Sequence, residues 1–119
     1  MPSKQATRRF RDIVTDIERI ERYCRSFDFA RFKDDEKTTD AVERCLARIS
    51  EAAVKLGDEA QALCPGQPWP DIRGLGNHLR HGYDMIDLGR VWRTVVVDLP
   101  PLKAACLETL ARLTPPEVT

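Results

Sequence analysis

The sequence predicts an all-α domain, a bundle of four to five helices, on three observations. Apolar residues recur at steps of three and four along most of the chain, which is the spacing of one helix face. Proline and glycine gather at a few points between these periodic stretches. The three consecutive valines at 95–97 are too few for a strand, and the sequence offers no second strand to pair with them. Together these features favour a helical bundle.

The first helix is expected over residues 6–26. Its other faces carry mixed charges, which favours a solvated helix surface over a nucleic-acid patch. Residues 26–36 are expected to be a connection in which three phenylalanines, Phe27, Phe29 and Phe32, fill the core. The apolar stripe of the helix consists of Phe10, Ile13, Val14, Ile17, Ile20 and Cys24.

A second helix is expected to begin at Thr39, or at Thr38, since both are good N-cap residues. Its stripe, from Val42 to Leu56, extends in this prediction to about residue 63. Gly57 weakens that extension by about 1 kcal/mol relative to alanine. The prolines at 65–70 then end the helix, and Trp69 between two of them is expected to be a core residue or an interface anchor.

A third, short helix is expected from an Asp71 cap to Gly82, with Ile72, Leu75 and Leu79 facing the core. A fourth helix is predicted to start near Asp87, and Pro100-Pro101 must break or kink it. An amphipathic helix then continues to residue 113, and residues 115–119 form a frayed tail.

Composition narrows the class of protein. The 119 residues fit one domain, 1–119, and 42% hydrophobic with 32% charged residues is typical of a soluble globular chain. The net charge is +0, so any RNA contact must come from a local cluster. There is no membrane span or signal peptide, so we expect a cytoplasmic protein. The four cysteines are widely spaced, which favours buried thiols over a metal site.

Potential chemistry is concentrated in residues 73–83. If the helix continues through this stretch, Arg73, Asn77, Arg80 and His81 share one outward arc, and His78 points to the other flank. An imidazole can take the proton of a ribose hydroxyl near neutral pH, and a guanidinium can hold the phosphate. The segment is thus a candidate site for metal-independent cleavage of RNA. The residues alone leave open that these are ordinary polar groups on a solvated helix.

The chain also resembles a known family over nearly its whole length. Its stretch Asn77-His-Leu-Arg-His-Gly-Tyr83 is similar to the Arg-Asn-x-Leu-x-His-x-Tyr signature of the HepT-like ribonuclease toxins of the HEPN superfamily, and we call residues 73–83, which include it, the motif segment. Asn77, Leu79, His81 and Tyr83 match, but Gly76 stands where that signature has arginine. Further similar pieces are Asp12-Ile13, Ile17-Glu-Arg-Ile20, Phe32, Thr39-Asp-Ala-Val-Glu-Arg44, Ile49-Ser-Glu-Ala52, Pro68-Trp69, Val91-Trp92 and Asp98-Leu-Pro-Pro-Leu102.

The resemblance implies a homodimer whose two motif segments face one cleft and cut RNA without metal or cofactor. His81 would act as base or acid, Asn77 would orient the phosphate, and Arg73 or Arg80 would replace the missing arginine. It also implies a partner, a minimal nucleotidyltransferase antitoxin that transfers AMP to Tyr83. The alternative is a catalytically inactive dimerisation and partner-binding module, disarmed by Gly76.

Overall fold

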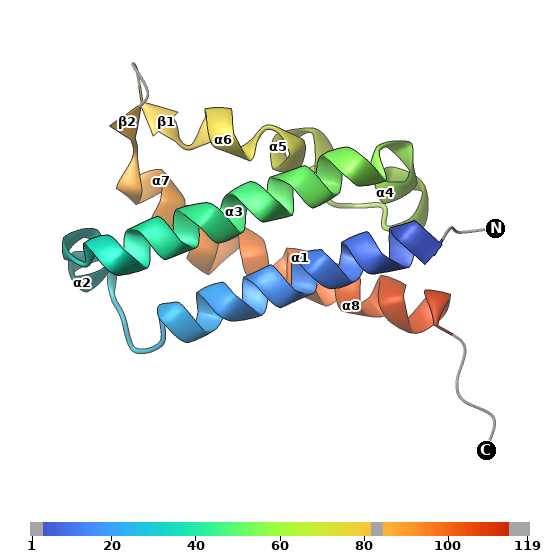
Figure 1. Ribbon diagram of the computed structural model, residues 1–119, viewed down its shortest axis with the longest axis horizontal. Helices are drawn as coiled ribbons and strands as arrows, with labels where there is room; N and C mark the ends of the chain where they lie inside the picture. The colour runs from blue at the N-terminus through green and yellow to red at the C-terminus, as the bar shows by residue number, and fades with distance from the viewer. Residues whose placement is uncertain (1–3, 82–84, 115–119) are drawn as a thin grey trace.

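Three long helices form the body of the protein. In the computed structural model, which describes residues 4–81 and 85–114 apart from the side chains of His78, Arg80 and His81, they are α1 (Lys4–Tyr23), α3 (Glu36–Leu56) and α8 (Leu99–Leu113). They lie side by side, and short elements cover one edge of the bundle (Figure 1). The all-α prediction is confirmed. The short elements are α2 (Phe29–Asp34), α4 (Asp58–Leu63), α5 (Trp69–Arg73), α6 (Leu75–His78), β1 (Arg80–His81), β2 (Met85–Ile86), α7 (Leu88–Arg93) and η1 (Thr94–Asp98).

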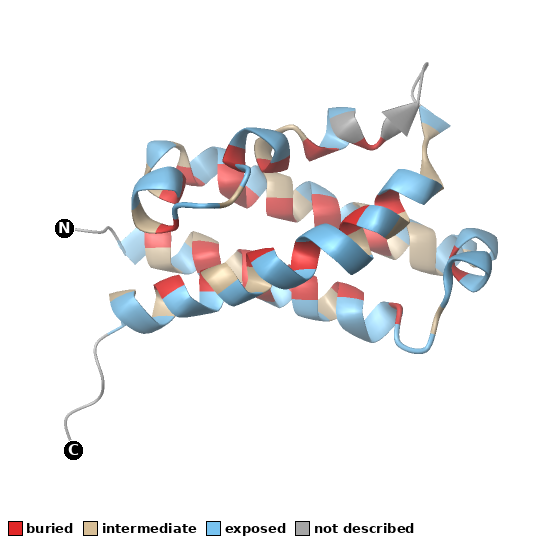
Figure 2. Cartoon of the chain, turned by 180° about the vertical axis from the view of Figure 1, so that it is seen from behind, coloured by how far each residue is buried: buried red, intermediate tan, exposed pale blue. Residues whose placement is uncertain are grey.

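The predicted apolar stripes face one another in a single core. Buried positions line the inner sides of the long helices, and exposed positions form the outer surface (Figure 2). Trp69 is a core residue, with 1% of its surface exposed, and its indole N–H donates to the Cys64 carbonyl at 2.8 Å. Its ring meets Phe10 edge to face, with centroids 6.2 Å apart. Trp69 therefore holds the α5 end of the motif segment against α1 and is not available at the surface as an interface anchor.

Aspartates cap three of the helices, and one of them replaces the threonine predicted to start the second long helix. Asp28, Asp35 and Asp87 each accept a hydrogen bond from the backbone N–H three residues on, the usual N-cap contact. Asp35 places the start of α3 at Glu36, so Thr39 lies inside the helix, where its hydroxyl donates to the Glu36 carbonyl. The prediction of a Thr38 or Thr39 cap was wrong because Asp35 offers the same contact earlier in the chain.

The region between α1 and α3 is more ordered than predicted. The first helix ends at Tyr23, since the chain turns at Ser26 with φ of 67°. The expected connection contains the six-residue helix α2, and Phe32 on it is fully buried with its ring centroid 5.0 Å from that of Trp92. Phe27 is partly buried against the core, but Phe29 is 39% exposed. The expectation that all three phenylalanines fill the core was wrong for Phe29.

Two backbone breaks set the direction of the later helices. Gly57 has a φ of 55°, which ends α3 at Leu56 and starts α4, so the predicted continuous helix to residue 63 is interrupted. This positive φ is open to glycine at little cost. The predicted kink at Pro100-Pro101 takes the form of the wider π-helical turn η1, from which the Leu99 N–H donates to the Thr94 carbonyl. Prolines lack the N–H that an α-helical path would need here.

Candidate active site

The motif segment starts on two short helices that pack on α3. Arg73 ends α5, and its carbonyl oxygen accepts a hydrogen bond of 2.8 Å from the hydroxyl of Ser50 on α3. Gly74 separates α5 from α6. Leu75 and Leu79 are buried, as predicted, whereas Gly76 and Asn77 are exposed. The segment thus presents Gly76 and Asn77 at the surface of the bundle.

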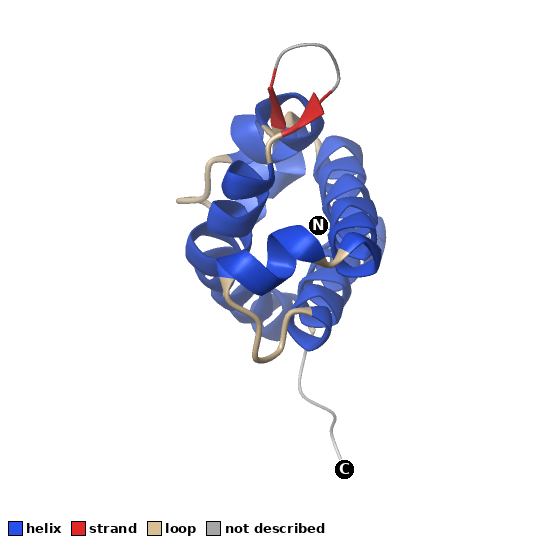
Figure 3. Ribbon diagram, turned by 90° about the vertical axis from the view of Figure 1, so that its left-hand side faces the viewer, coloured by secondary structure: helices blue, strands red, loops and turns tan. Residues whose placement is uncertain are grey.

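The helix does not continue through the segment. It stops at His78, and Arg80–His81 form strand β1, which pairs antiparallel with β2 so that Arg80 lies opposite Ile86 and His81 opposite Met85. The N–H of Asp87 donates to the Leu79 carbonyl at 2.8 Å and closes the ribbon at its base. Figure 3 shows this ribbon projecting at one edge of the bundle.

The predicted helix up to Gly82 was therefore wrong, and so was the helical arc built on it. A strand does not keep the roughly 100° turn per residue that placed Arg80 and His81 beside Arg73 and Asn77. The side chains of His78, Arg80 and His81, and the whole of residues 82–84 with Tyr83, lie outside the described part of the chain. Their proposed roles rest on the sequence and stay predictions.

Gly76 occupies open space. A Cβ atom built on it meets no heavy atom within 4 Å, and its φ is not in the positive region. It borders a small hollow of about 70 Å³ between α3 and α6 that Leu46, Ile86 and Glu43 also line. The backbone at this position can therefore carry a longer side chain, including the arginine of the family signature, without displacing the core.

A larger recess opens on the other side of the motif segment. We call it the α6–α7 recess: its floor consists of Leu75, Leu79 and Thr94, its rim carries Arg93 and Asp98, and its volume is about 340 Å³. Thr94 is buried and its hydroxyl donates to the Arg90 carbonyl at 2.9 Å, so the floor is mainly apolar. Sequence reasoning missed Arg93 and Asp98 because both lie beyond the motif and border the same recess only through the turn η1.

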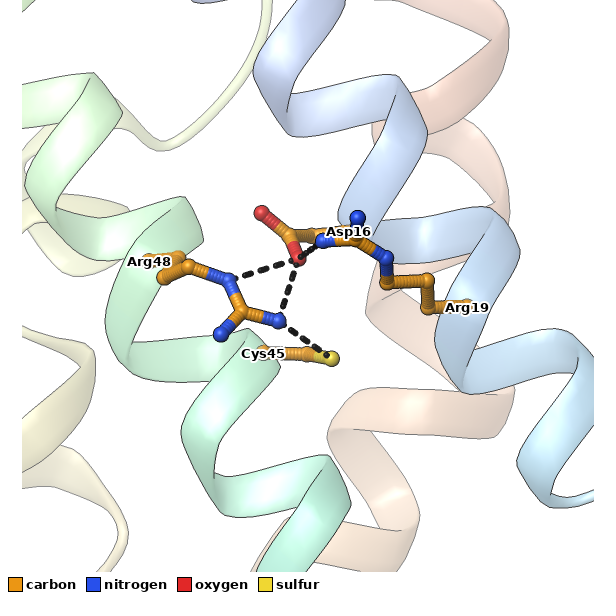
Figure 4. A network of polar contacts seen from close by, with 4 residues as sticks. All are labelled: Asp16, Arg19, Cys45 and Arg48. Atoms are coloured by element: carbon orange, nitrogen blue, oxygen red, sulfur yellow. Dashed lines mark hydrogen bonds and ion pairs between the residues drawn. The ribbon is translucent and has the colours of Figure 1, made fainter.

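A second charged recess lies between α1 and α3. We call it the α1–α3 recess, and its volume is about 290 Å³. At its centre Asp16, only 4% exposed, accepts hydrogen bonds from Arg48 at 2.9 Å and from Arg19 at 3.1 Å, while Arg48 also donates to the sulfur of Cys45 (Figure 4). Asp16, which stands beside the predicted apolar stripe, is a buried charged residue that sequence reasoning also missed.

The cysteines are buried free thiols, as predicted. Burial, with a smaller contribution from Cys45, raises the pKa of Cys24 to about 11, so this thiol stays protonated near neutral pH. Within residues 4–81 and 85–114, no three His, Cys, Asp or Glu side chains gather in a way that could hold a metal ion. No helix in the same ranges is long and apolar enough to cross a membrane.

Comparison with known proteins supports the family resemblance seen in the sequence. A family model described as Ribonuclease HepT-like matches residues 13–109, which include the motif segment and both recesses except for Arg9 and Asp12. A protein of Thermococcus cleftensis named "Probable ribonuclease HepT" is 37% identical over 92 residues, 77% of this chain and 84% of that protein.

A protein of Methanocaldococcus jannaschii named as a putative RNase is 27% identical over 103 residues, 87% of this chain and 89% of that protein. Another putative RNase, from Caldanaerobacter subterraneus, is 29% identical over 96 residues, 81% of this chain and 82% of that protein. No solved structure matches the chain significantly. On the family match over residues 13–109, the chain belongs to the HepT-like ribonuclease family.

Proposed function

We propose that this protein is the ribonuclease toxin of a toxin–antitoxin pair and that it cuts RNA without a metal ion or cofactor. The observation that carries the proposal is the family match, which spans the motif Asn77-His-Leu-Arg-His-Gly-Tyr83. In addition, Asn77 is exposed, and Leu75 and Leu79, which lie two residues before and after it, line the α6–α7 recess. The protein is expected to act in the cytoplasm, where such a toxin meets its RNA.

The proposed reaction is a transesterification. His81 takes the proton of a ribose 2′-hydroxyl, whose oxygen attacks the adjacent phosphorus and forms a 2′,3′-cyclic phosphate. The bond from phosphorus to the 5′-oxygen breaks, and that oxygen leaves with a proton from a second acid. Asn77 orients the phosphate, and a guanidinium stabilises the charge on its oxygens. Hydrolysis of the cyclic product yields a 3′-phosphate.

The position that supplies this guanidinium in the family signature carries no arginine in this chain. Gly76 replaces the signature arginine, and the proposed substitutes are Arg73 and Arg80. Arg73 is half-buried. Its carbonyl accepts a hydrogen bond from Ser50, which fixes the backbone of Arg73 and does not involve its guanidinium. The absence of arginine at position 76 favours low ribonuclease activity. For this reason we retain a second candidate function, an inactive dimerisation and partner-binding module.

The proposal includes a homodimer in which two motif segments share one cleft. A line of exposed small and apolar residues follows η1 and α8 at helical spacing and supports this part of it: Val97, Pro100, Ala104, Leu107 and Ala111. Such an apolar face on a helix is typical of a protein interface. Sedimentation of the purified chain tests it, and a monomer at micromolar concentration would exclude the shared cleft.

The proposal also includes inhibition of the ribonuclease by an antitoxin. Tyr83 is the expected target of a minimal nucleotidyltransferase antitoxin, which would transfer AMP to the phenol oxygen and release pyrophosphate from ATP. The bulky anionic group would then block the RNA-binding cleft. A small nucleotidyltransferase reading frame next to the gene, and recovery of that enzyme with the chain, are the expected observations.

The decisive experiment restores the missing charge. Gly76→Arg is expected to raise the rate of RNA cleavage in EDTA by about 100-fold or more, since one well-placed charge or donor at a reacting phosphate is worth roughly that factor. Gly76→Gln is the matched control, because it fills the same space without charge, and His81→Ala in the Gly76→Arg background should abolish the gain. If Gly76→Arg and Gly76→Gln leave RNA equally intact, the inactive binding module is the better description.

A further inference from the structure

The α6–α7 recess is large enough for a ligand and lies next to the motif. Its volume of about 340 Å³ falls within the range of small-molecule sites, about 300–1,000 Å³. Two of its floor residues, Leu75 and Leu79, belong to the motif segment itself. His81 follows Leu79 by two residues, so the Cα atoms of these two residues are at most about 7 Å apart. A nucleotide held in the recess would therefore be a close neighbour of the proposed cleavage step.

Two charged side chains at the rim have unused bonding capacity. Arg93 and Asp98 both border the recess, yet neither forms a side-chain hydrogen bond or ion pair within the part of the chain that the structure describes. Arg90 and Asp71 border it as well, but neither is without a partner, and Arg90 pairs with Asp87 at 3.5 Å. Among the described side chains at the rim, the groups without a partner are thus the cation of Arg93 and the anion of Asp98, above an apolar floor.

The π-helical turn is what brings this pair together. In an α-helix, residues five apart point about 140° away from each other, because each residue turns the helix by about 100°. In a π-turn the hydrogen bond joins residues five apart and each residue turns the helix by less than in an α-helix, so positions 93 and 98 lie closer to one face. The bond from the Leu99 N–H to the Thr94 carbonyl is such a five-residue step. The prolines at 100 and 101 favour this turn and thereby build the rim.

The charge balance indicates the class of ligand. Among the side chains that the structure describes, two arginines and two aspartates border the recess, so these four groups together give no net positive charge to attract a bare phosphate. An apolar floor with one free acceptor group and one free cation suits a flat, neutral ring with hydrogen-bond donors on one edge. An unstacked nucleobase of single-stranded RNA has this chemistry, and arginine is a common stacking or phosphate partner for it.

We infer that the α6–α7 recess binds a guanine of single-stranded RNA beside the cleavage step, with Asp98 accepting from its N1–H and N2 amine and Arg93 contacting its ring face or its phosphate. A carboxylate has two acceptor oxygens and no donor, and guanine has two adjacent donors on its pairing edge. Adenine and cytosine offer one amine there, and uracil offers one ring N–H. This inference rests on the proposed function in taking RNA as the ligand and in placing the cleavage step at His81.

The test measures, by fluorescence anisotropy in the presence of EDTA, how tightly labelled eight-nucleotide RNAs bind to the full chain. One RNA contains only uridine, a second has a single central guanosine, and a third has inosine there, which lacks the N2 amine. We expect the guanosine RNA to bind about tenfold tighter than the uridine RNA, with inosine in between. Asp98→Asn and Asp98→Ala should remove the preference, so that each variant binds the guanosine and uridine RNAs with equal affinity.

Arg93→Gln should weaken the binding of all three RNAs, and Arg25→Gln, in the exposed turn after α1, is the matched control that should not. Equal affinity of the unchanged chain for guanosine and uridine RNA would overturn the inference, as would a preference that survives both Asp98 variants. Binding is measured without cleavage, so an inactive chain can still show the preference. A Gly76→Arg variant that cuts RNA with no preference for guanosine keeps the proposed function and removes this site.

Discussion

The two charged recesses of this protein differ in how their charges are used. In the α1–α3 recess the four cations Arg9, Arg19, Arg48 and Lys55 all have carboxylate partners at 2.9–3.4 Å. In the α6–α7 recess, Arg93 and Asp98 have no such partners within the described residues.

The α1–α3 recess has more charged groups, but fewer of them are available to bind a ligand. Asp16 takes up the guanidiniums of two helices and ties α1 to α3, so these charges serve the fold (Figure 4). One donor there, the buried Nε of Arg9, lacks a partner among the described residues. What marks a binding site is unused hydrogen-bonding capacity beside an apolar floor, and the recess next to the motif has more of it.

The largest expected effect is on the free energy of unfolding, which should depend on the charges of the α1–α3 recess and not on those of the α6–α7 recess. Asp16→Ala should lower the free energy of unfolding by about 2 kcal/mol, because it leaves two guanidiniums without their counter-ion. The loss stays below that of a fully buried pair, since the side chains of Arg48 and Arg19 are 37% and 40% exposed and can turn to water. Asp98→Ala should stay within about 0.5 kcal/mol. Urea unfolding measures both, and equal losses would abolish the distinction.

A smaller effect is expected on the salt dependence of RNA binding. Arg93→Gln should reduce the slope of log affinity against log salt concentration by about 0.7, the contribution of one phosphate contact on a single strand. Arg19→Gln and Lys55→Gln, in the α1–α3 recess, should leave the slope unchanged because their charges are already paired. Titrations at several salt concentrations check this, and a reduced slope for Lys55→Gln would mean that RNA also uses the α1–α3 recess.

The smallest effect concerns the backbone beside the two recesses. Gly76→Ala should raise the free energy of unfolding by about 0.5–1 kcal/mol, since its φ is ordinary and its Cβ meets no neighbour. Gly57→Ala, at the end of α3, should lower it by about 1 kcal/mol or more, because φ there is 55°. Thermal unfolding compares them. A loss at Gly76 would show that the position does not tolerate the side chain that the gain-of-function test requires.

Sequence reasoning succeeded where the helices are long. The stripes of α1 and α3 were readable because apolar spacing records which face is buried, and Asp87 and the two prolines marked real boundaries. It failed on residues 73–83, where a helix was extended to Gly82. Gly74 and the pairing of β1 with β2 end the helix at His78, and no local pattern of three or four residues predicts a two-residue ribbon.

The sequence by itself determined the helical class, the core stripes and the family motif with Gly76 in place of arginine, because periodicity and residue identity are local properties. Only the tertiary structure decided which charges are satisfied and which remain open. Asp16 meets Arg48 across 32 residues of sequence, and Arg93 and Asp98 border one recess on either side of a turn that widens the helix. Such pairings depend on how elements pack, which the order of residues does not display.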